Sequence, residues 1–220
     1  MRRYVSKAAC ILSIGVAAHA GDPHPESVPA PEIRLGDSWT YDSIDGYKNV
    51  REFTIESHAT EITAERIVFE WKRTDDRASG SWIVNRNLNW IERRSTSGSN
   101  VADPYYPNLS FPLAVGKTWK QKVTFVAKYE QEKTIVADLQ GKVLGWEQVT
   151  VPAGTFDALK IEISGPYRGE SGNFNWKGYL RDFVWYAPEV KRPVRTQYED
   201  TASGHGYFRD YQDLAAYKLN

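Results

Sequence analysis

Residues 146–164 read WEQVTVPAGTFDALKIEIS, and this stretch decides the class of fold. The tripeptide Pro-Ala-Gly at 152–154 stands between two runs in which apolar and polar residues alternate. Proline sets φ for the first central position of a turn, and glycine tolerates the positive φ that closes a short hairpin. The stretch therefore predicts two antiparallel strands, Trp146–Val151 and Phe156–Ser164, joined by a tight turn.

The same alternation continues in both directions along the chain beyond residue 32. It is typical of antiparallel strands buried on one face, and the many aromatic and β-branched residues agree with it. The clearest runs are Trp39–Ile44, Glu52–Glu56, Ile67–Lys72, Trp119–Phe125, Ile135–Leu139 and Leu159–Ser164. Only residues 213–219 are ambiguous between strand and helix. We predict an all-β fold, an antiparallel meander of about ten to fourteen strands forming a curved sheet, an open barrel or a sandwich.

Turn-forming dipeptides separate these runs. They are Asp45-Gly46, Ser79-Gly80, Ser97-Gly98, Gly165-Pro166, Ser171-Gly172 and Ser203-Gly204. Glycine, proline and small polar residues favour the backbone angles of turns, so we expect the chain to reverse at each of them.

A seven-residue pattern occurs twice, each time before a long predicted strand. Ile33–Trp39 reads IRLGDSW and Leu113–Trp119 reads LAVGKTW. Both copies read aliphatic, any residue, aliphatic, glycine, charged, hydroxyl, tryptophan. Chance likeness over seven residues stays open, but this agreement favours two equivalent strand starts or an ancient duplication. We therefore expect two similar halves, residues 32–108 and 109–220, joined by the segment Pro104–Pro107.

Residues 1–20 carry the features of a signal peptide. Three basic residues precede an apolar run too short to span a bilayer, and Ala18–Ala20 supplies a small-x-small cleavage site. The proline-rich segment 21–31 predicts an extended tether, followed by a single β domain at 32–220. The only cysteine, Cys10, lies in the predicted signal. A cysteine-free exported chain fits a bacterial periplasm or secretion from a bacterium.

Composition excludes several classes of protein and partner. The chain has 220 residues, 41% of them hydrophobic and 25% charged, which is enough for a core and unlike disordered, collagen or coiled-coil sequences. Basic and acidic residues number 28 each, and removal of the predicted signal would leave a net charge of −3. That balance argues against nucleic acid or an anionic membrane as the main partner. The predicted mature chain contains no transmembrane segment.

Three phrases in the second half resemble a bacterial family. They are residues 111–119 (FPLAVGKTW), 149–161 (VTVPAGTFDALKI) and 185–190 (WYAPEV). In this order they are similar to the TapB-like family of exported bacterial domains of unknown function, over roughly residues 32–200. A glycine usually follows Tyr-Ala-Pro in that family, where this chain has Glu189–Arg192, so this turn departs from the pattern. The resemblance implies an exported β domain and supplies no catalytic residues.

Residue types that carry catalysis or bind metals are sparse. The histidines of the predicted mature chain are His24, His58 and His205. Ser203–Gly206 places a serine near a histidine, but turn composition explains all four residues, and no acid is placed to orient the histidine. Glu199 and Asp200 are neighbours on a predicted strand and point to opposite faces, so without a bulge they cannot act on one substrate. Because no metal-ligand spacing is present either, we predict no catalytic residue, no metal site and no cofactor.

Eight tryptophans are an unusual load for this length. Trp39, Trp71, Trp119 and Trp185 belong to apolar stripes and are interpreted as core. Other aromatic residues stand among amide and basic neighbours, or in the segment between the halves, and could stack on a sugar or hold an apolar ligand. These candidates are Trp82, Trp90, Tyr105, Tyr106 and Trp176. A second core layer or a covered edge is the alternative for them.

We interpret the chain as an exported envelope β domain, non-enzymatic, that binds a small apolar molecule, a glycan or an envelope protein through an aromatic-lined face. Two alternatives stay open: a hydrolase of periplasmic substrates, and a structural or assembly component of the envelope. A pocket in the fold would favour binding. A convergent nucleophile, base and orienting acid would favour hydrolysis, and a filled sheet with an exposed apolar edge would favour assembly.

Overall fold

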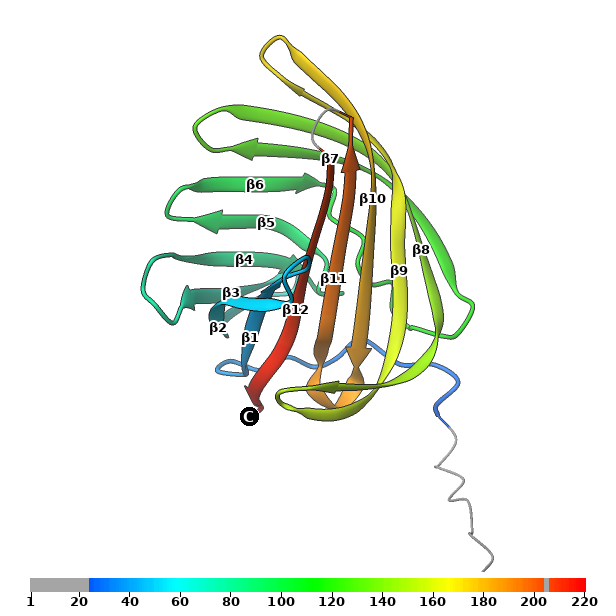
Figure 1. The fold of residues 1–220 in the computed structure, drawn as a ribbon. Helices are drawn as coiled ribbons and strands as arrows, with labels where there is room; N and C mark the ends of the chain where they lie inside the picture. Colours follow the sequence, from blue (N-terminus) through cyan, green and yellow to red (C-terminus); the bar gives the residue numbers. More distant parts are fainter. Residues whose placement is uncertain (1–23, 204–205) are drawn as a thin grey trace, which may run out of the picture.

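The computed structural model describes residues 24–203 and 206–220, which form a closed antiparallel barrel. Each strand pairs with the strands before and after it in the chain, and β1 closes the barrel by pairing with both β2 and β12 (Figure 1). The all-β antiparallel prediction is confirmed. The sequence left a curved sheet, an open barrel and a sandwich as alternatives. The structure is a barrel, and it is closed because β1 pairs with β12.

The described residues contain twelve strands and one short 3-10 helix. In chain order they are β1 (Ser38–Asp45), β2 (Val50–Ile62), β3 (Arg66–Arg73), β4 (Ser79–Asn85), β5 (Trp90–Ser95), β6 (Gly98–Asp103), β7 (Thr118–Lys128), β8 (Glu132–Val151), β9 (Gly154–Ser171), β10 (Phe174–Ala187), η1 (Pro188–Val190), β11 (Arg192–Ala202) and β12 (Gly206–Lys218). The ambiguous segment 213–219 is therefore strand up to Lys218.

Strand length differs between the two sides of the barrel. β8 and β9 have 20 and 18 residues, whereas β5 and β6 have 6 each. Figure 1 shows β8 to β12 running steeply along one side, while β3 to β6 run across the other side with their hairpins projecting outward. Strands of a closed barrel must tilt relative to its axis, and this difference in direction reflects that tilt.

The hairpin predicted at 152–154 is present. Val151 pairs with Gly154, so Pro152 and Ala153 form a two-residue turn between β8 and β9. Gly154 has a φ of 140°, which favours glycine at this position. Burial alternates through both flanking strands, with Leu159, Ile161 and Ile163 buried, as the sequence pattern predicts.

Two dipeptides expected to form turns lie inside strands instead, and those predictions are wrong. Ser79-Gly80 belongs to β4, and Gly165-Pro166 belongs to β9. A Cβ on Gly80 would lie 1.9 Å from the carbonyl oxygen of Arg94, and one on Gly165 would lie 2.0 Å from that of Asp138. The glycines are there because the neighbouring backbone comes too close for any side chain, which a sequence pattern does not distinguish from a turn.

The two copies of the repeated pattern have the same local geometry. Gly36 and Gly116 have φ values of 81° and 84°. The N–H of Gly36 donates to the carbonyl of Ala59 in β2, and the N–H of Gly116 donates to the carbonyl of Val143 in β8, both at 2.9 Å. The acceptor residue returns a hydrogen bond of 2.9 Å to the residue after the glycine. The pattern therefore marks two equivalent strand starts, at β1 and β7. The division into halves 32–108 and 109–220 stays a prediction.

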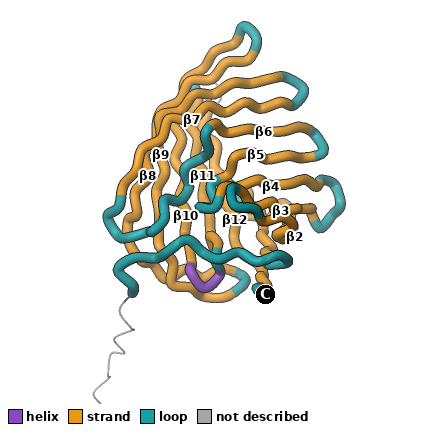
Figure 2. Tube along the Cα trace, turned by 180° about the vertical axis from the view of Figure 1, so that it is seen from behind, coloured by secondary structure: helices purple, strands orange, loops and turns teal. Residues whose placement is uncertain are grey.

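The segment 21–31 was expected to be an extended tether, but its described part, residues 24–31, lies against the barrel. Val28 is 4% exposed and exchanges both backbone hydrogen bonds with Leu113, at 2.7 and 2.8 Å. The ring of His24 stacks on Trp146 with the centroids 4.4 Å apart. Figure 2 shows this segment crossing one end of the barrel. The predicted signal peptide lies outside the described residues.

Candidate functional site

The barrel encloses a cavity of about 550 Å³. Pockets for small molecules typically measure roughly 300–1,000 Å³ and have mostly apolar walls with a few polar groups. The aromatic wall of this cavity includes Phe69, Trp71, Trp82, Trp90, Tyr106 and Phe125. Its ionisable wall includes Arg93, Lys133, Asp182, Arg192, Asp200 and Asp210.

Cross-strand pairing brings three wall residues together. Trp82 of β4 lies directly opposite Phe69 of β3 on one side and Arg93 of β5 on the other. Residues directly opposite one another in antiparallel strands project from the same face of the sheet, so all three point inward. Trp71 stacks on Trp82, with ring centroids 5.9 Å apart and planes inclined by 22°.

A bulge in β5 places a charged residue beside the aromatic wall. The register shifts between Ile83 and Val84, which pair with Glu92 and Trp90, so one residue of β5 has no opposite partner. The extra residue brings Trp90 and Arg93, three positions apart, to the same face. The guanidinium carbon of Arg93 lies 4.5 Å from the centroid of the Trp90 ring.

Tyr106 joins this aromatic cluster to a buried carboxyl. Its ring lies 5.7 Å from that of Trp90 and 5.8 Å from that of Phe125, centroid to centroid, and its hydroxyl donates to Asp182 at 3.3 Å. Burial raises the pKa of Asp182 to about 7, although the charge of Arg93 and the hydrogen bond from Tyr106 lower it in part. The buried position of Asp182 therefore favours its neutral form.

A second carboxyl is held by tyrosines on neighbouring strands. Tyr167 donates its hydroxyl to the two oxygens of Asp200 at 2.8 and 3.0 Å, and Tyr198 donates at 3.4 Å. Burial raises the pKa of Asp200, and both tyrosine hydrogen bonds lower it in part. Glu199 does not line the cavity and lies 3.6 Å from Arg209. The two adjacent carboxylates thus lie on opposite faces, as strand alternation requires.

Arg192 is the first residue of β11, and its guanidinium lies among four aromatic rings. The distances from Cζ to the ring centroids are 4.5 Å for Phe69, 5.1 Å for Trp39, 5.6 Å for Trp82 and 5.8 Å for Tyr41. A cation over a ring face within about 6 Å is attracted by the ring quadrupole. The Nη1 atom of Arg192 is buried and has no hydrogen-bond partner among the described residues. Burial lowers the pKa of this guanidinium.

Two aromatic residues of β1 fix the backbone on either side of Arg192. The indole N–H of Trp39 donates to the carbonyl of Val190 at 2.9 Å, and the hydroxyl of Tyr41 donates to the carbonyl of Pro193 at 2.7 Å. Lys191, between them, is left-handed with a φ of 63°. The guanidinium is thus presented by a backbone that is held at both ends.

Three of the five candidates from the sequence meet at the cavity. Trp82, Trp90 and Tyr106 line it, whereas Tyr105 and Trp176 are not among the residues that do so. Trp176 instead covers a glycine of the adjacent strand, since a Cβ on Gly169 would lie 2.2 Å from its ring. Whether any of the five binds a ligand stays a prediction.

The ionisable wall residues were missed because charged side chains are normally solvated. A signal for one of them is present in β10, where Leu180, Asp182 and Val184 occupy alternate positions and all three are buried. A lone acid within an inward-facing apolar register is such a signal. Arg93 gives no comparable signal because the bulge displaces it from a regular alternation.

The other polar residues weighed in the sequence lie in structural settings. Ser203 accepts a hydrogen bond from the backbone N–H of Lys177 at 3.1 Å, and His205 lies outside the described residues. His58 is exposed on β2. Within residues 24–203 and 206–220, no group of three or more His, Cys, Asp or Glu side chains could hold a metal ion. No helix in this part of the chain is long and apolar enough to cross a membrane.

No family model matches the sequence, and no curated protein matches it significantly. Among solved structures, the chain is similar to a candidate lipoprotein from Parabacteroides distasonis, with 15% identity, a TM-score of 0.47 and coverage of 88% of this chain and 100% of that one. It is also similar to a candidate exported protein with a YmcC-like fold from Bacteroides fragilis, with 13% identity, a TM-score of 0.44 and coverage of 87% and 99%. The hypothetical lipoprotein YmcC from Escherichia coli is 8% identical, with a TM-score of 0.48 and coverage of 82% and 83%. The resemblance to the TapB-like family is not confirmed by a family model.

Proposed function

We propose that this protein is an exported, non-enzymatic binding protein that holds a small, largely apolar molecule inside its barrel. The observation that carries the proposal is the position of polar atoms without partners. Among the described residues, five buried side-chain nitrogen or oxygen atoms have no hydrogen-bond partner, and four of them belong to residues that line the cavity. These four atoms are Trp71 Nε1, Asn100 Oδ1, Asn108 Oδ1 and Arg192 Nη1.

Unpartnered buried polar groups are costly, and native proteins keep few of them. Their concentration around one aromatic cavity is typical of a site whose ligand supplies the missing partners. A cavity of about 550 Å³ inside the barrel also favours a small molecule over an envelope protein or a long glycan, because the ligand must fit within it. Export is supported by the signal-peptide features of residues 1–20 and by the absence of cysteine from the rest of the sequence.

Titration with a neutral, polarity-sensitive dye, N-phenyl-1-naphthylamine, tests the proposal. We expect saturable binding with enhanced, blue-shifted emission, and at least tenfold weaker binding for Trp82→Ala, which removes a ring from the cavity wall. Trp146→Ala is the matched control: it removes the same ring from a position that does not line the cavity and should bind as the parent does. Circular dichroism checks that each variant is folded. Absence of saturable binding, or equal weakening by both substitutions, would contradict the proposed function.

A further inference from the structure

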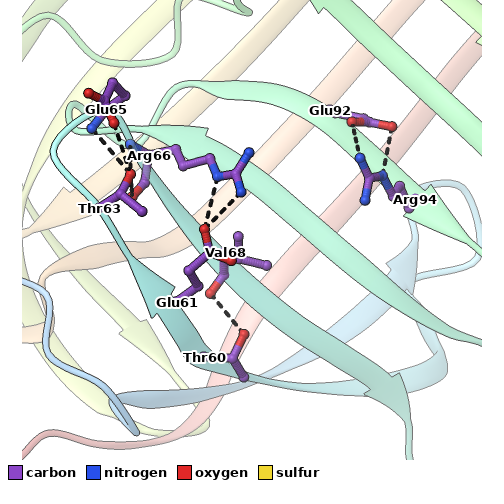
Figure 3. Close-up of polar contacts among 8 residues, drawn as sticks. All are labelled: Thr60, Glu61, Thr63, Glu65, Arg66, Val68, Glu92 and Arg94. Atoms are coloured by element: carbon purple, nitrogen blue, oxygen red, sulfur yellow. Dashed lines mark hydrogen bonds and ion pairs between the residues drawn. The ribbon is translucent and has the colours of Figure 1, made fainter.

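Several arginines of the outer wall have charged partners close by. Arg66 donates two hydrogen bonds to one oxygen of Glu61, at 2.8 and 3.0 Å, and Arg94 donates to both oxygens of Glu92 at 2.8 Å (Figure 3). These pairs join residues close in the sequence on exposed strands. Their charge is neutralised locally.

The two arginines that line the cavity, Arg93 and Arg192, have no such ion-pair partner in the described part of the chain. Neither Arg93 nor Arg192 has a carboxylate oxygen within 4.0 Å, and neither guanidinium forms a hydrogen bond with another described residue. Both lie against aromatic rings instead, and both are next to Trp82: Arg93 is its cross-strand partner, and Arg192 lies 5.6 Å from its centroid. Arg93 is exposed, whereas Arg192 is half-buried and its Nη1 atom is buried without a partner in residues 24–203 and 206–220. It is therefore the charge of Arg192 that is withdrawn from water without a counter-ion, which is unfavourable, and ring contacts offset only part of that cost.

The carboxyls of the cavity do not supply the missing negative charge. Asp182 is bonded by Tyr106 and Asp200 by Tyr167 and Tyr198. Burial raises the pKa of Asp182, Asp200 and Asp210, and so favours their neutral forms. Among the described residues, no carboxylate oxygen lies within ion-pair distance of the Arg192 guanidinium where it meets the aromatic wall.

Two of the four unpartnered atoms at the cavity belong to residues in contact with Trp82, and both are donors. Arg192 Nη1 and Trp71 Nε1 lack acceptors, and both residues contact Trp82 by ring stacking or by the cation–ring contact. Two unpartnered donors and a guanidinium without an ion-pair partner call for a ligand group that is negative and only accepts hydrogen bonds. The planar guanidinium fork matches the oxygens of a carboxylate or a phosphate, and its backbone is already fixed by Trp39 and Tyr41.

We propose that the ligand is an amphiphile with a single oxyanion head that binds to Arg192, while its apolar chain lies against the aromatic wall of the cavity. This inference rests on the proposed function, since it names the class of molecule that the same cavity holds. The Trp71 indole N–H donates to the same head group. A neutral glycan would satisfy the donors but would leave the guanidinium without a counter-ion.

Displacement of N-phenyl-1-naphthylamine by three twelve-carbon probes tests this inference. The probes are dodecanoate, dodecyl phosphate and dodecan-1-ol, each kept below its aggregation concentration. We expect at least one acid to bind ten or more times more tightly than the alcohol, and the preferred acid distinguishes a carboxylate head from a phosphate head. Equal affinity of the parent protein for both acids and the alcohol would overturn the inference. This comparison needs no variant to fold.

Variants then assign the preference to a residue. Arg192→Met keeps an unbranched apolar stem and removes the guanidinium with its charge, so the acids should lose their advantage while dodecan-1-ol still binds. Arg192→Lys should retain part of the preference, and Arg66→Met, on the outer wall, should bind as the parent does. A preference that survives Arg192→Met would overturn the role of Arg192. Failure of the dye and of all three probes to bind would instead contradict the proposed function itself.

Discussion

Lys191 and Asp37 form an ion pair with 3.0 Å between Nζ and Oδ2, although 154 positions separate them in the chain. The carboxylate of Asp37 is fully buried and also accepts the backbone N–H groups of Arg34 at 3.0 Å and Asn220 at 2.7 Å. One side chain thus joins the start of β1, the end of the chain and the turn that presents Arg192. Asp37 is the charged residue of the first copy of the repeated pattern.

Asp37→Asn should lower the free energy of unfolding by about 1–3 kcal/mol, because Lys191 loses its counter-ion and a buried hydrogen-bond network loses its charge. Urea denaturation followed by tryptophan fluorescence measures the change. Asp157→Asn is the control, since Asp157 is exposed. An equal effect of the two substitutions would show that the pair does not stabilise the fold.

The same pair predicts a loss of stability in acid. Burial raises the pKa of Asp37, but the backbone hydrogen bonds from Asn220 and Arg34 and the ion pair with Lys191 outweigh it, and the pKa is lowered overall from 3.8. A lowered carboxyl pKa gives stability that is complete above the unfolded value and is lost as pH falls through the folded value. The difference in stability between the parent and Asp37→Asn should therefore shrink below about pH 4. A difference that stays constant from pH 7 to pH 3 would contradict this assignment.

Asp182 should have the opposite pH dependence. Because its pKa rises from 3.8 to about 7 on folding, the native state binds a proton more tightly than the unfolded chain between these values. Its contribution to stability is then greatest below pH 4 and falls as pH rises to about 7. In Asp182→Asn the free energy of unfolding should therefore change less between pH 4 and pH 7. Above pH 7 it should exceed that of the parent by roughly 2–4 kcal/mol. Denaturation from pH 4 to 8.5 measures it, with Asp157→Asn expected to keep the parent's slope.

Two glycines of β8 offer a matched pair. A Cβ on Gly141 would lie 2.0 Å from Cε2 of Trp119, whereas nothing lies within 4 Å of one on Gly145. Gly141→Ala should lower the free energy of unfolding by about 1–3 kcal/mol, because the new methyl group displaces the Trp119 indole from its contact with the strand. Gly145→Ala should change it by less than about 0.5 kcal/mol. Thermal unfolding compares them. Similar melting temperatures for the two variants would mean that Trp119 does not pack on Gly141.

The docked segment before β1 gives a further prediction. Val28 is buried and pairs with Leu113, so Val28→Ala should lower the free energy of unfolding by about 1–3 kcal/mol. Val50→Ala is the control, because Val50 is 52% exposed. If residues 24–31 were a free tether, neither substitution would alter the urea midpoint.

Strand formation could be predicted because its pattern is local. A period of two shows which residues share a face, so the alternation at Leu159, Ile161 and Ile163 was readable without the structure. Glycine was harder to interpret. In Pro-Ala-Gly at 152–154 it closes a turn, but at Gly80 and Gly165 it allows two backbones to approach, and only the neighbouring strand distinguishes the two uses.

The sequence by itself determined an antiparallel all-β chain, its central hairpin and two equivalent strand starts, since each depends on residues within a few positions of one another. Tertiary structure alone decided that the strands close into a barrel, that Trp176 lies outside the cavity, and that Arg93 and Arg192 line it. The reason is physical: a charged side chain on a strand is expected to face water, and only closure of the barrel makes one face of the sheet an enclosed interior.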